Sequence, residues 1–182
     1  MLKKLRGFTL IELLIVVAII GILAALLIPN AITAIQKAKQ KSVMKGIVTI
    51  STAVADFITD NGTTPDSPGG PYDGKAFYTS LSPFYIKVLP ITDQWATPYQ
   101  AYCGDAVNGQ YAISGASGDD FLIFSFGRDG IKGSWGGFVS TNPEGGLFIV
   151  NQMAHFNYDL VMWNGSWIRA PKTAEAPATT TP

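Results

Sequence analysis

The chain has 182 residues, a formal net charge of zero, one cysteine and one histidine. A neutral chain has no electrostatic attraction for a nucleic-acid backbone, so we expect no nucleic-acid partner. The lone Cys103 excludes an internal disulfide and any site with several cysteine ligands, and the lone His155 excludes metal motifs with two histidines. No recognisable nucleophile stands beside His155, so we expect the protein not to be an enzyme.

The N-terminal region combines a short basic head with a long apolar run. Lys3, Lys4 and Arg6 come first, and no charged residue occurs from position 13 to position 35. At about 1.5 Å per residue, a helix over 8–35 can cross a hydrocarbon core of about 30 Å. The apolar run of an ordinary secretory signal covers only about 7–15 residues. Because basic residues stay on the cytoplasmic side, the pattern predicts one membrane-spanning helix followed by a domain outside the cytoplasm.

Glu12 is the one carboxylate close to this apolar run. A charge in mid-membrane costs about 2.5–3.5 kcal/mol or more, so we expect Glu12 to have a partner, which in an assembling protein can lie on another copy. The alternative is a plain single-pass anchor, which would gain nothing from this carboxylate. Pro29 removes one helical hydrogen bond and predicts a kink, or else it is an ordinary tolerated membrane proline.

The segment 3–14, which reads Lys-Lys-Leu-Arg-Gly-Phe-Thr-Leu-Ile-Glu-Leu-Leu, resembles the class III signal of type IV pilins and type II secretion pseudopilins. The resemblance implies a prepilin peptidase that cuts between Gly7 and Phe8 and methylates the new N-terminus at Phe8. It also implies that Glu12 attracts the N-terminal ammonium of a neighbouring subunit during assembly of a homopolymer. Opposite charges a few ångströms apart attract strongly where the dielectric constant is low.

Beyond the apolar run, hydrophobic residues recur at spacings of three and four, which predicts that the first helix continues to about Thr59 with one buried face. These residues are Val43, Ile47, Ile50, Val54 and Phe57. Asn61-Gly62 should end this helix. The stretch 63–74 should be a surface loop because it is rich in proline and glycine. Ser82-Pro83 predicts a short helix to about Val88, which Pro90 would stop.

The remaining chain alternates like short strands. Strands are predicted over 99–103, 110–114 and 121–126, with a tight turn at Asn108-Gly109 between the first two. Segments 159–163 and 166–169 flank Asn164-Gly165, a strong hairpin signal. The composition of 170–182 predicts a disordered tail. The expected fold is α+β and pilin-like, with one long N-terminal helix packed on a small antiparallel sheet.

A second resemblance concerns the outer part of the chain. The segment that begins Asp93-Gln94-Trp95-Ala96-Thr97 and ends Pro98-Tyr99 is similar to a pattern of the major pseudopilins, although Gln94 replaces a proline and Ala96-Thr97 replaces Gly-Asn. Segments 123–130 and 156–163 resemble two further stretches of that group, with an insertion around 134–155 between them. The resemblance implies a filament that drives protein export in type II secretion.

The same resemblance implies calcium as a possible cofactor. Asp129 and Asp159 would supply side chains, with carbonyls near Phe126 and Gly130, since calcium takes six to eight oxygen ligands. The group usually has another acidic residue beside the terminal aspartate, where this chain has Tyr158 or Leu160. Two alternatives are a surface turn with solvated aspartates and an insertion that replaces the ion as the stabiliser of the loop.

The resemblances divide the chain into a leader (1–7), a transmembrane and filament-core helix (8–35), a periplasmic domain (36–169) and a tail (170–182). They imply a structural subunit in the bacterial inner membrane, with the filament in the periplasm or at the cell surface. The implied partners are minor pseudopilins and an inner-membrane assembly platform. One alternative is a true type IV pilin for adhesion, motility or DNA uptake, although such pilins commonly close their C-terminal region with a disulfide. The other is an anchored domain that never polymerises.

Overall fold

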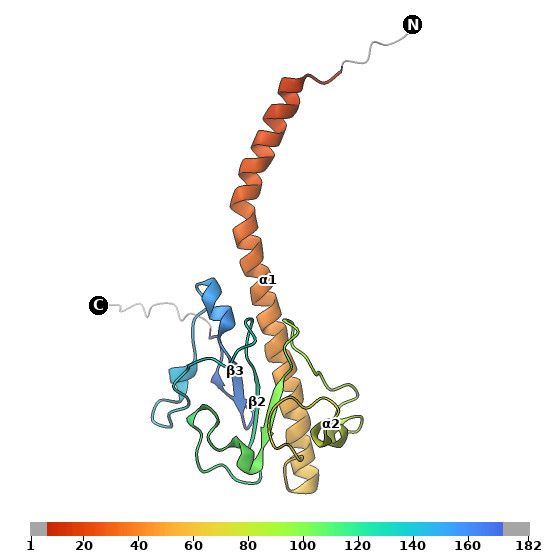
Figure 1. Cartoon of the computed structure of the whole chain (residues 1–182), viewed down its shortest axis with the longest axis vertical. Helices are drawn as coiled ribbons and strands as arrows, with labels where there is room; N and C mark the ends of the chain where they lie inside the picture. Colours follow the sequence, from red (N-terminus) through yellow and green to blue (C-terminus); the bar gives the residue numbers. More distant parts are fainter. Residues whose placement is uncertain (1–6, 173–182) are drawn as a thin grey trace, which may run out of the picture. The chain divides into compact units, whose positions relative to one another are not determined.

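The computed structural model describes residues 7–172. The chain divides into two compact units, Met1–Ala38 and Lys39–Pro182. The long helix α1, Leu10–Asn61, contributes to both. The remaining helices and strands belong to the second unit, called the outer unit below (Figure 1).

The part of α1 in the first unit is apolar and exposed. An 18-residue window has a mean hydropathy of 3.1, and none of it is buried, so the helix is long and apolar enough to cross a membrane. The helix continues through Pro29 without interruption (Figure 1). Two polar side chains donate hydrogen bonds back to its carbonyls, from Asn30 to Leu26 at 3.5 Å and from Thr33 to Pro29 at 3.1 Å. These bonds give both polar side chains a partner within the helix itself. The kink at Pro29 stays a prediction.

The part of α1 in the outer unit confirms the predicted apolar stripe. Val43, Ile47, Ile50 and Val54 are fully buried, and Phe57 packs against the same core. The helix ends at Asn61, two residues beyond the predicted end. Gly62 has a positive φ of 70°, and its N–H donates to the carbonyl of Ile58 at 2.8 Å, which is the expected glycine cap.

The sheet is antiparallel, with the order β1-β2-β3-β4. The strands are β1 (Gln100–Cys103), β2 (Phe121–Ser125), β3 (Leu160–Trp163) and β4 (Ser166–Arg169). The predicted strands over 99–103 and 121–126 and the Asn164-Gly165 hairpin are therefore confirmed, and both turn residues have positive φ. The free edge of β1 is covered by the 63–74 loop, because the N–H of Ala101 donates to the carbonyl of Gly70 at 3.0 Å.

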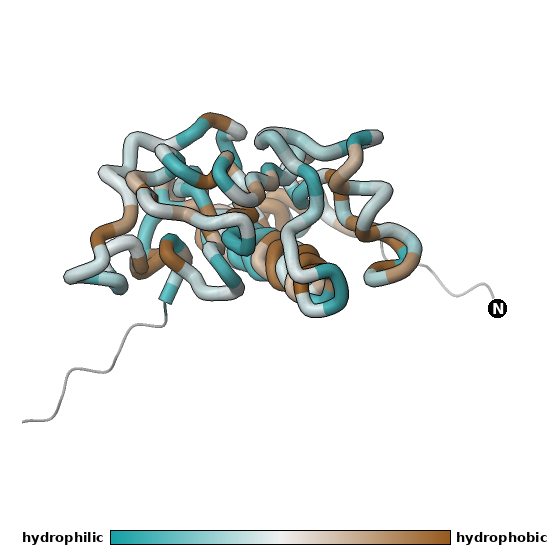
Figure 2. The backbone as a smooth tube through the Cα atoms, turned by 90° about the horizontal axis from the view of Figure 1, so that it is seen from below, coloured by the Kyte–Doolittle hydropathy of each residue, from teal (hydrophilic) through white to brown (hydrophobic). Residues whose placement is uncertain are grey.

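Both faces of this sheet are buried. One face packs on the outer part of α1, and the other packs on a second core that includes side chains from the insertion, among them Trp135 and Phe138. Every residue of β2 is buried, so the alternation of exposed and buried positions usual in a one-sided antiparallel sheet is absent. Figure 2 views the chain from below, nearly along α1, and shows brown and teal residues at the end of the helix with the loops of the outer unit beside it.

Two predicted elements are wrong. The short helix α2 is Ala76–Leu81, before Ser82-Pro83 rather than after it. Ser82 is extended (φ −102°, ψ 135°) and ends the helix, because a residue that precedes proline is disfavoured in the helical region. The predicted strand over 110–114 is instead the 3₁₀ helix η2, Gln110–Ala112. Tyr111 and Ala112 have positive φ, which an extended strand cannot accommodate.

The connections contain three further 3₁₀ helices: η1 (Gly104–Val107), η3 (Pro143–Gly146) and η4 (Met153–Asn157). The chain is still ordered at Ala170, where the tail was predicted to begin. Ala170 is buried and accepts a hydrogen bond from the N–H of Phe148 at 3.0 Å, while the N–H of Lys172 donates to the carbonyl of Phe148 at 2.8 Å. The remaining tail, 173–182, and leader positions 1–6 lie outside the described residues.

Candidate functional site

The predicted processing point, the bond between Gly7 and Phe8, lies before the first turn of α1. Both residues are exposed, and the Phe8 side chain is 85% exposed. A Cβ at Gly7 would have no neighbour within 4 Å. The bond is therefore in open, non-helical chain, the condition in which a backbone can enter a peptidase cleft.

Glu12 forms a capping box with Thr9 at the start of α1. Its Oε2 accepts hydrogen bonds from the Thr9 backbone N–H and from the Thr9 hydroxyl, both at 2.8 Å. In return, the Thr9 Oγ1 accepts the Glu12 N–H at 3.3 Å. The reciprocal pair satisfies two donors that a helix terminus leaves unpaired. Sequence reasoning assigned Glu12 to assembly alone and missed this local role, although Thr-x-x-Glu before an apolar run is the usual signature.

The segments 93–99 and 123–130, which resemble patterns of the major pseudopilins, are hydrogen-bonded to each other. Asp93 accepts the backbone N–H groups of Trp95 at 2.8 Å and Thr97 at 3.0 Å, and its other oxygen accepts the Ser125 hydroxyl at 2.7 Å. Ser125 in turn accepts the N–H of Gly127 at 3.1 Å. Asp93 and Ser125 therefore join the loop before β1 to the end of β2, which is where the Asp129 loop begins.

Asp159, a predicted calcium ligand, is buried immediately before β3 with its carboxylate already bonded. Its Oδ2 accepts the Tyr111 hydroxyl at 2.8 Å and the Gly133 N–H at 2.9 Å, and its Oδ1 lies 3.1 Å from the same N–H. Burial raises the pKa of Asp159 above its usual value, while those hydrogen bonds and the charge of Arg169 oppose the shift. Asp129 is close enough to add to the rise, but it is exposed, and it accepts the Ile131 N–H at 3.2 Å.

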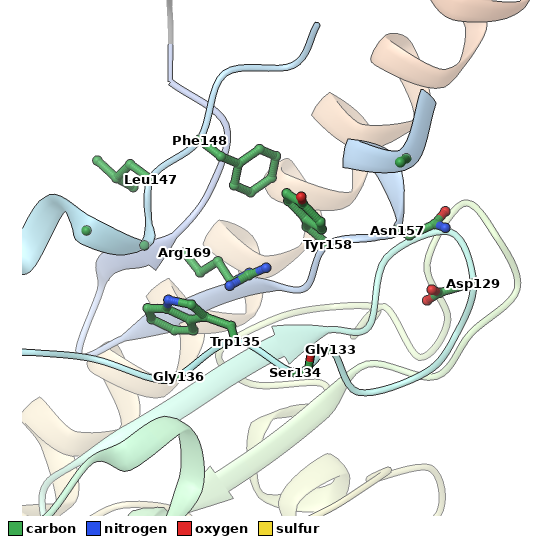
Figure 3. Close-up of a pocket in the computed structure, with 13 residues that line it drawn as sticks. Asp129, Gly133, Ser134, Trp135, Gly136, Leu147, Phe148, Asn157, Tyr158 and Arg169 are labelled. Atoms are coloured by element: carbon green, nitrogen blue, oxygen red, sulfur yellow. The ribbon is translucent and has the colours of Figure 1, made fainter. Parts of the chain in front are cut away.

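The guanidinium of Arg169 is near enough to Asp159 to act on it electrostatically. The Arg169 side chain is only 8% exposed and sits between two aromatic rings, 5.0 Å from the Trp135 centroid and 4.9 Å from the Tyr158 centroid. Figure 3 shows this layered arrangement at the edge of a cavity of about 650 Å³, with Asp129 on another part of the cavity lining. The arrangement places a positive charge within electrostatic reach of Asp159.

Comparison with known proteins identifies the family. Residues 2–28 match the family described as "Prokaryotic N-terminal methylation motif". The chain is 32% identical over 140 residues to "Type II secretion system core protein G" of Aeromonas hydrophila, covering 72% of this chain and 89% of that protein. The corresponding protein of Vibrio cholerae is 32% identical, and the match covers 74% of this chain and 88% of that protein. The corresponding protein of Pseudomonas aeruginosa is 33% identical, and the match covers 72% of this chain and 89% of that protein.

The chain belongs to the core protein G family, the major pseudopilins. The predicted family and structural function are thereby confirmed, and the structure confirms the predicted α+β fold. The relatives are named for type II secretion, which separates this pseudopilin from the surface pili that the sequence left as an alternative.

The residues of this pseudopilin do not fit the calcium site that the resemblance implied. Calcium takes six to eight oxygens, and among the described residues no third acidic side chain is grouped with Asp129 and Asp159 to supply more of them. The Asp159 carboxylate accepts hydrogen bonds from Tyr111 and Gly133, and the charge of Arg169 already acts on it electrostatically. Sequence reasoning missed Tyr111, Trp135 and Arg169, because no short motif links positions so far apart in the chain. Calcium binding itself stays a prediction.

The lone cysteine and the lone histidine have ordinary structural surroundings. Cys103 is buried within β1, and burial, with a smaller contribution from Asp66, raises the pKa of its thiol to about 12. His155 has its Nδ1 2.7 Å from the carbonyl oxygen of Ile149, and its ring stacks on Tyr158. Cys103 therefore behaves as a small buried hydrophobe, as predicted.

Proposed function

We propose that this pseudopilin is cut between Gly7 and Phe8, N-methylated at Phe8, and assembled into a homopolymer in which Glu12 pairs with the N-terminal amine of an adjoining subunit. The observation that carries the proposal is the placement of Glu12. It is the only acidic residue in the exposed apolar part of α1, at the end where processing would create a new amine. A carboxylate in that position is costly in lipid and becomes favourable when a cation neutralises it.

The exposure of α1 supports assembly through this helix. Side chains such as Leu10, Ile11 and Leu26 are 83%, 65% and 68% exposed, which a soluble monomer would not tolerate over so long a surface. Lipid would cover these side chains in the membrane, and copies of the same helix would cover them in a filament. The helix can therefore be stored in a bilayer and later packed into a filament core without a change of secondary structure.

We further propose that the outer unit lies in the periplasm and that the subunit works with a prepilin peptidase, minor pseudopilins and an inner-membrane assembly platform. The basic residues Lys3, Lys4 and Arg6 favour a cytoplasmic start. The names of the relatives favour a filament that serves protein secretion. Protease added to spheroplasts should digest the outer unit; complete protection of that unit would contradict this orientation.

The central experiment replaces Glu12 with glutamine in cells that carry the secretion apparatus. Glu12→Gln keeps the shape of the side chain but removes the charge, so assembled filaments should be lost while the subunit still accumulates in the membrane. Losing one member of a buried ion pair typically costs about 3–5 kcal/mol. Asp60→Asn is the matched control, because Asp60 is exposed near the other end of α1 and should leave assembly unchanged.

Mass spectrometry of the assembled form gives an independent test. The expected N-terminus is methylated Phe8. Filaments built from subunits that retain Met1, or normal assembly by the Glu12→Gln variant, would refute the proposal.

A further inference from the structure

The insertion around 134–155 is bound tightly to the C-terminal strand. The N–H of Phe148 donates to the carbonyl of Ala170, and the N–H of Lys172 donates to the carbonyl of Phe148. A Cβ at Gly146 would lie 2.0 Å from the Ile168 carbonyl oxygen and 2.6 Å from the Trp135 ring, so only glycine allows the backbone to approach so closely. The insertion is therefore an ordered part of the outer unit.

This insertion completes an aromatic stack around Arg169. Trp135 covers one face of the guanidinium, and Tyr158 covers the other. The insertion also supplies Phe148, whose ring meets Tyr158 edge-on at 5.0 Å, and His155, whose ring stacks on Tyr158 at 5.0 Å. A cation between two aromatic faces is stabilised by both ring quadrupoles, which offsets part of the cost of burying it.

The loop that contains Asp129 is closed by direct contacts within the chain. The N–H of Arg128 donates to the carbonyl of Phe156 at 2.8 Å, and the Arg128 Nε donates to Asn157 at 2.9 Å. A Cβ at Gly127 would lie 2.6 Å from the Tyr158 carbonyl oxygen. The loop is therefore joined through its own backbone to the segment that precedes Asp159.

Three groups of the chain act on the Asp159 carboxylate. Tyr111 and Gly133 donate hydrogen bonds to the carboxylate, and Arg169 provides the nearby positive charge. The Tyr111 backbone adopts a positive φ of 47°, a strained conformation for a tyrosine that persists only when its surroundings hold it. Two restraints hold Tyr111: its hydroxyl donates to Asp159, and its ring packs on the Phe124 ring with 5.2 Å between the centroids.

We propose that Arg169, held between Trp135 and Tyr158, acts with Tyr111 and Gly133 as a built-in replacement for calcium, so that the loop that contains Asp129 closes without a metal ion. The insertion is the structural element that makes the replacement possible, because it contributes Trp135 and the rings that support Tyr158. These residues all lie in the outer unit, so their role does not depend on how Glu12 acts in assembly.

The first experiment compares thermal unfolding of the full chain in detergent with excess chelator and with excess calcium chloride, followed by tryptophan fluorescence. The melting temperature should be the same in both conditions. A lower melting temperature in chelator, restored by calcium chloride, would overturn the proposal.

The second experiment removes the internal cation. Arg169→Met keeps the length and apolar stem of the side chain but removes the charge, and it should lower the melting temperature by at least about 4 °C. Tyr111→Phe, which removes only the hydroxyl bonded to Asp159, should also lower it. Lys172→Met is the matched control, because the Lys172 side chain is 44% exposed and its removal should have little effect.

A wild-type melting temperature for Arg169→Met would overturn the proposal. If that variant fails to fold, the chelator comparison on the wild type still decides the question.

Discussion

Thr9 and Glu12 bind each other at the first turn of α1, with the Glu12 carboxylate accepting two hydrogen bonds and the Thr9 hydroxyl accepting one. The residue assigned to subunit assembly thus has an intramolecular partner within its own chain. These bonds give partners to polar groups at the start of α1 and orient the Glu12 carboxylate toward the backbone N–H of Thr9, the residue after Phe8. An incoming amine would therefore meet a carboxylate that is already positioned.

Replacing Thr9 with valine should loosen the first turn of α1. Valine has nearly the same shape but no hydroxyl, so two of the three bonds of the capping box are lost. Loss of such a cap typically costs about 1 kcal/mol. Amide hydrogen exchange in micelles should become faster by a factor of about five at Glu12 and Leu13, whose N–H groups donate to the Thr9 hydroxyl and the Thr9 carbonyl. Thr9→Ser keeps the hydroxyl and should retain the wild-type rates; equal protection in the valine variant would show that the box does not stabilise the helix.

Gly46 is a point of close approach between α1 and a tyrosine that precedes the sheet. The hydroxyl of Tyr99 donates to the carbonyl of Val43 at 3.3 Å, and a Cβ at Gly46 would lie 2.3 Å from that hydroxyl oxygen. Helix propensity alone would make Gly46→Ala stabilising by about 1 kcal/mol. We expect the opposite sign, a loss of about 1–3 kcal/mol from overpacking, measured by chemical denaturation.

A double-mutant cycle tests the cause of that loss. Tyr99→Phe removes the crowded oxygen, so Gly46→Ala should cost less in the Tyr99→Phe background than in the wild type. Equal costs in both backgrounds would mean that the tyrosine hydroxyl is not the obstacle.

The sequence-based predictions succeed where local chemistry determines the structure. The stripe from Val43 to Val54 and the Asn164-Gly165 turn follow from short-range rules, and both are confirmed. The predicted strand over 110–114 fails because Tyr111 is fixed by Asp159, a residue far away in the chain. The packing of Arg169 by the insertion was unpredictable for the same reason, since its partners are brought together only by the completed fold.

Ala96 carries backbone strain at the position where the major pseudopilin pattern has glycine. Its φ is +64°, a left-handed conformation that costs a non-glycine residue roughly 1–2 kcal/mol. Ala96→Gly should therefore raise stability, by up to about 1 kcal/mol after the greater flexibility of the unfolded chain is subtracted. Chemical denaturation of the Ala96→Gly variant should show a higher midpoint than that of the wild type.

The same substitution at Ala53, a buried helical position, should lower the midpoint. A lower midpoint for Ala96→Gly as well would show that the Ala96 conformation is not strained.

Asp120 should make the outer unit sensitive to acid. Partial burial tends to raise the pKa of Asp120, but hydrogen bonds from the Ser117 backbone at 2.5 Å, from the Asn164 side chain and from the Ser117 hydroxyl outweigh it, so the pKa lies below its usual value. A carboxyl whose pKa is lowered in the folded state stabilises the fold fully when the pH is above its pKa in the unfolded state, about 3.8. It loses that contribution as the pH falls through its pKa in the folded state.

Asp120→Asn should therefore melt below the wild type at neutral pH, and the two melting temperatures should converge in acid. Asp119→Asn, at the exposed neighbouring position, should follow the wild-type curve. A constant difference between wild type and Asp120→Asn across the whole pH range would contradict a stabilising charge at Asp120.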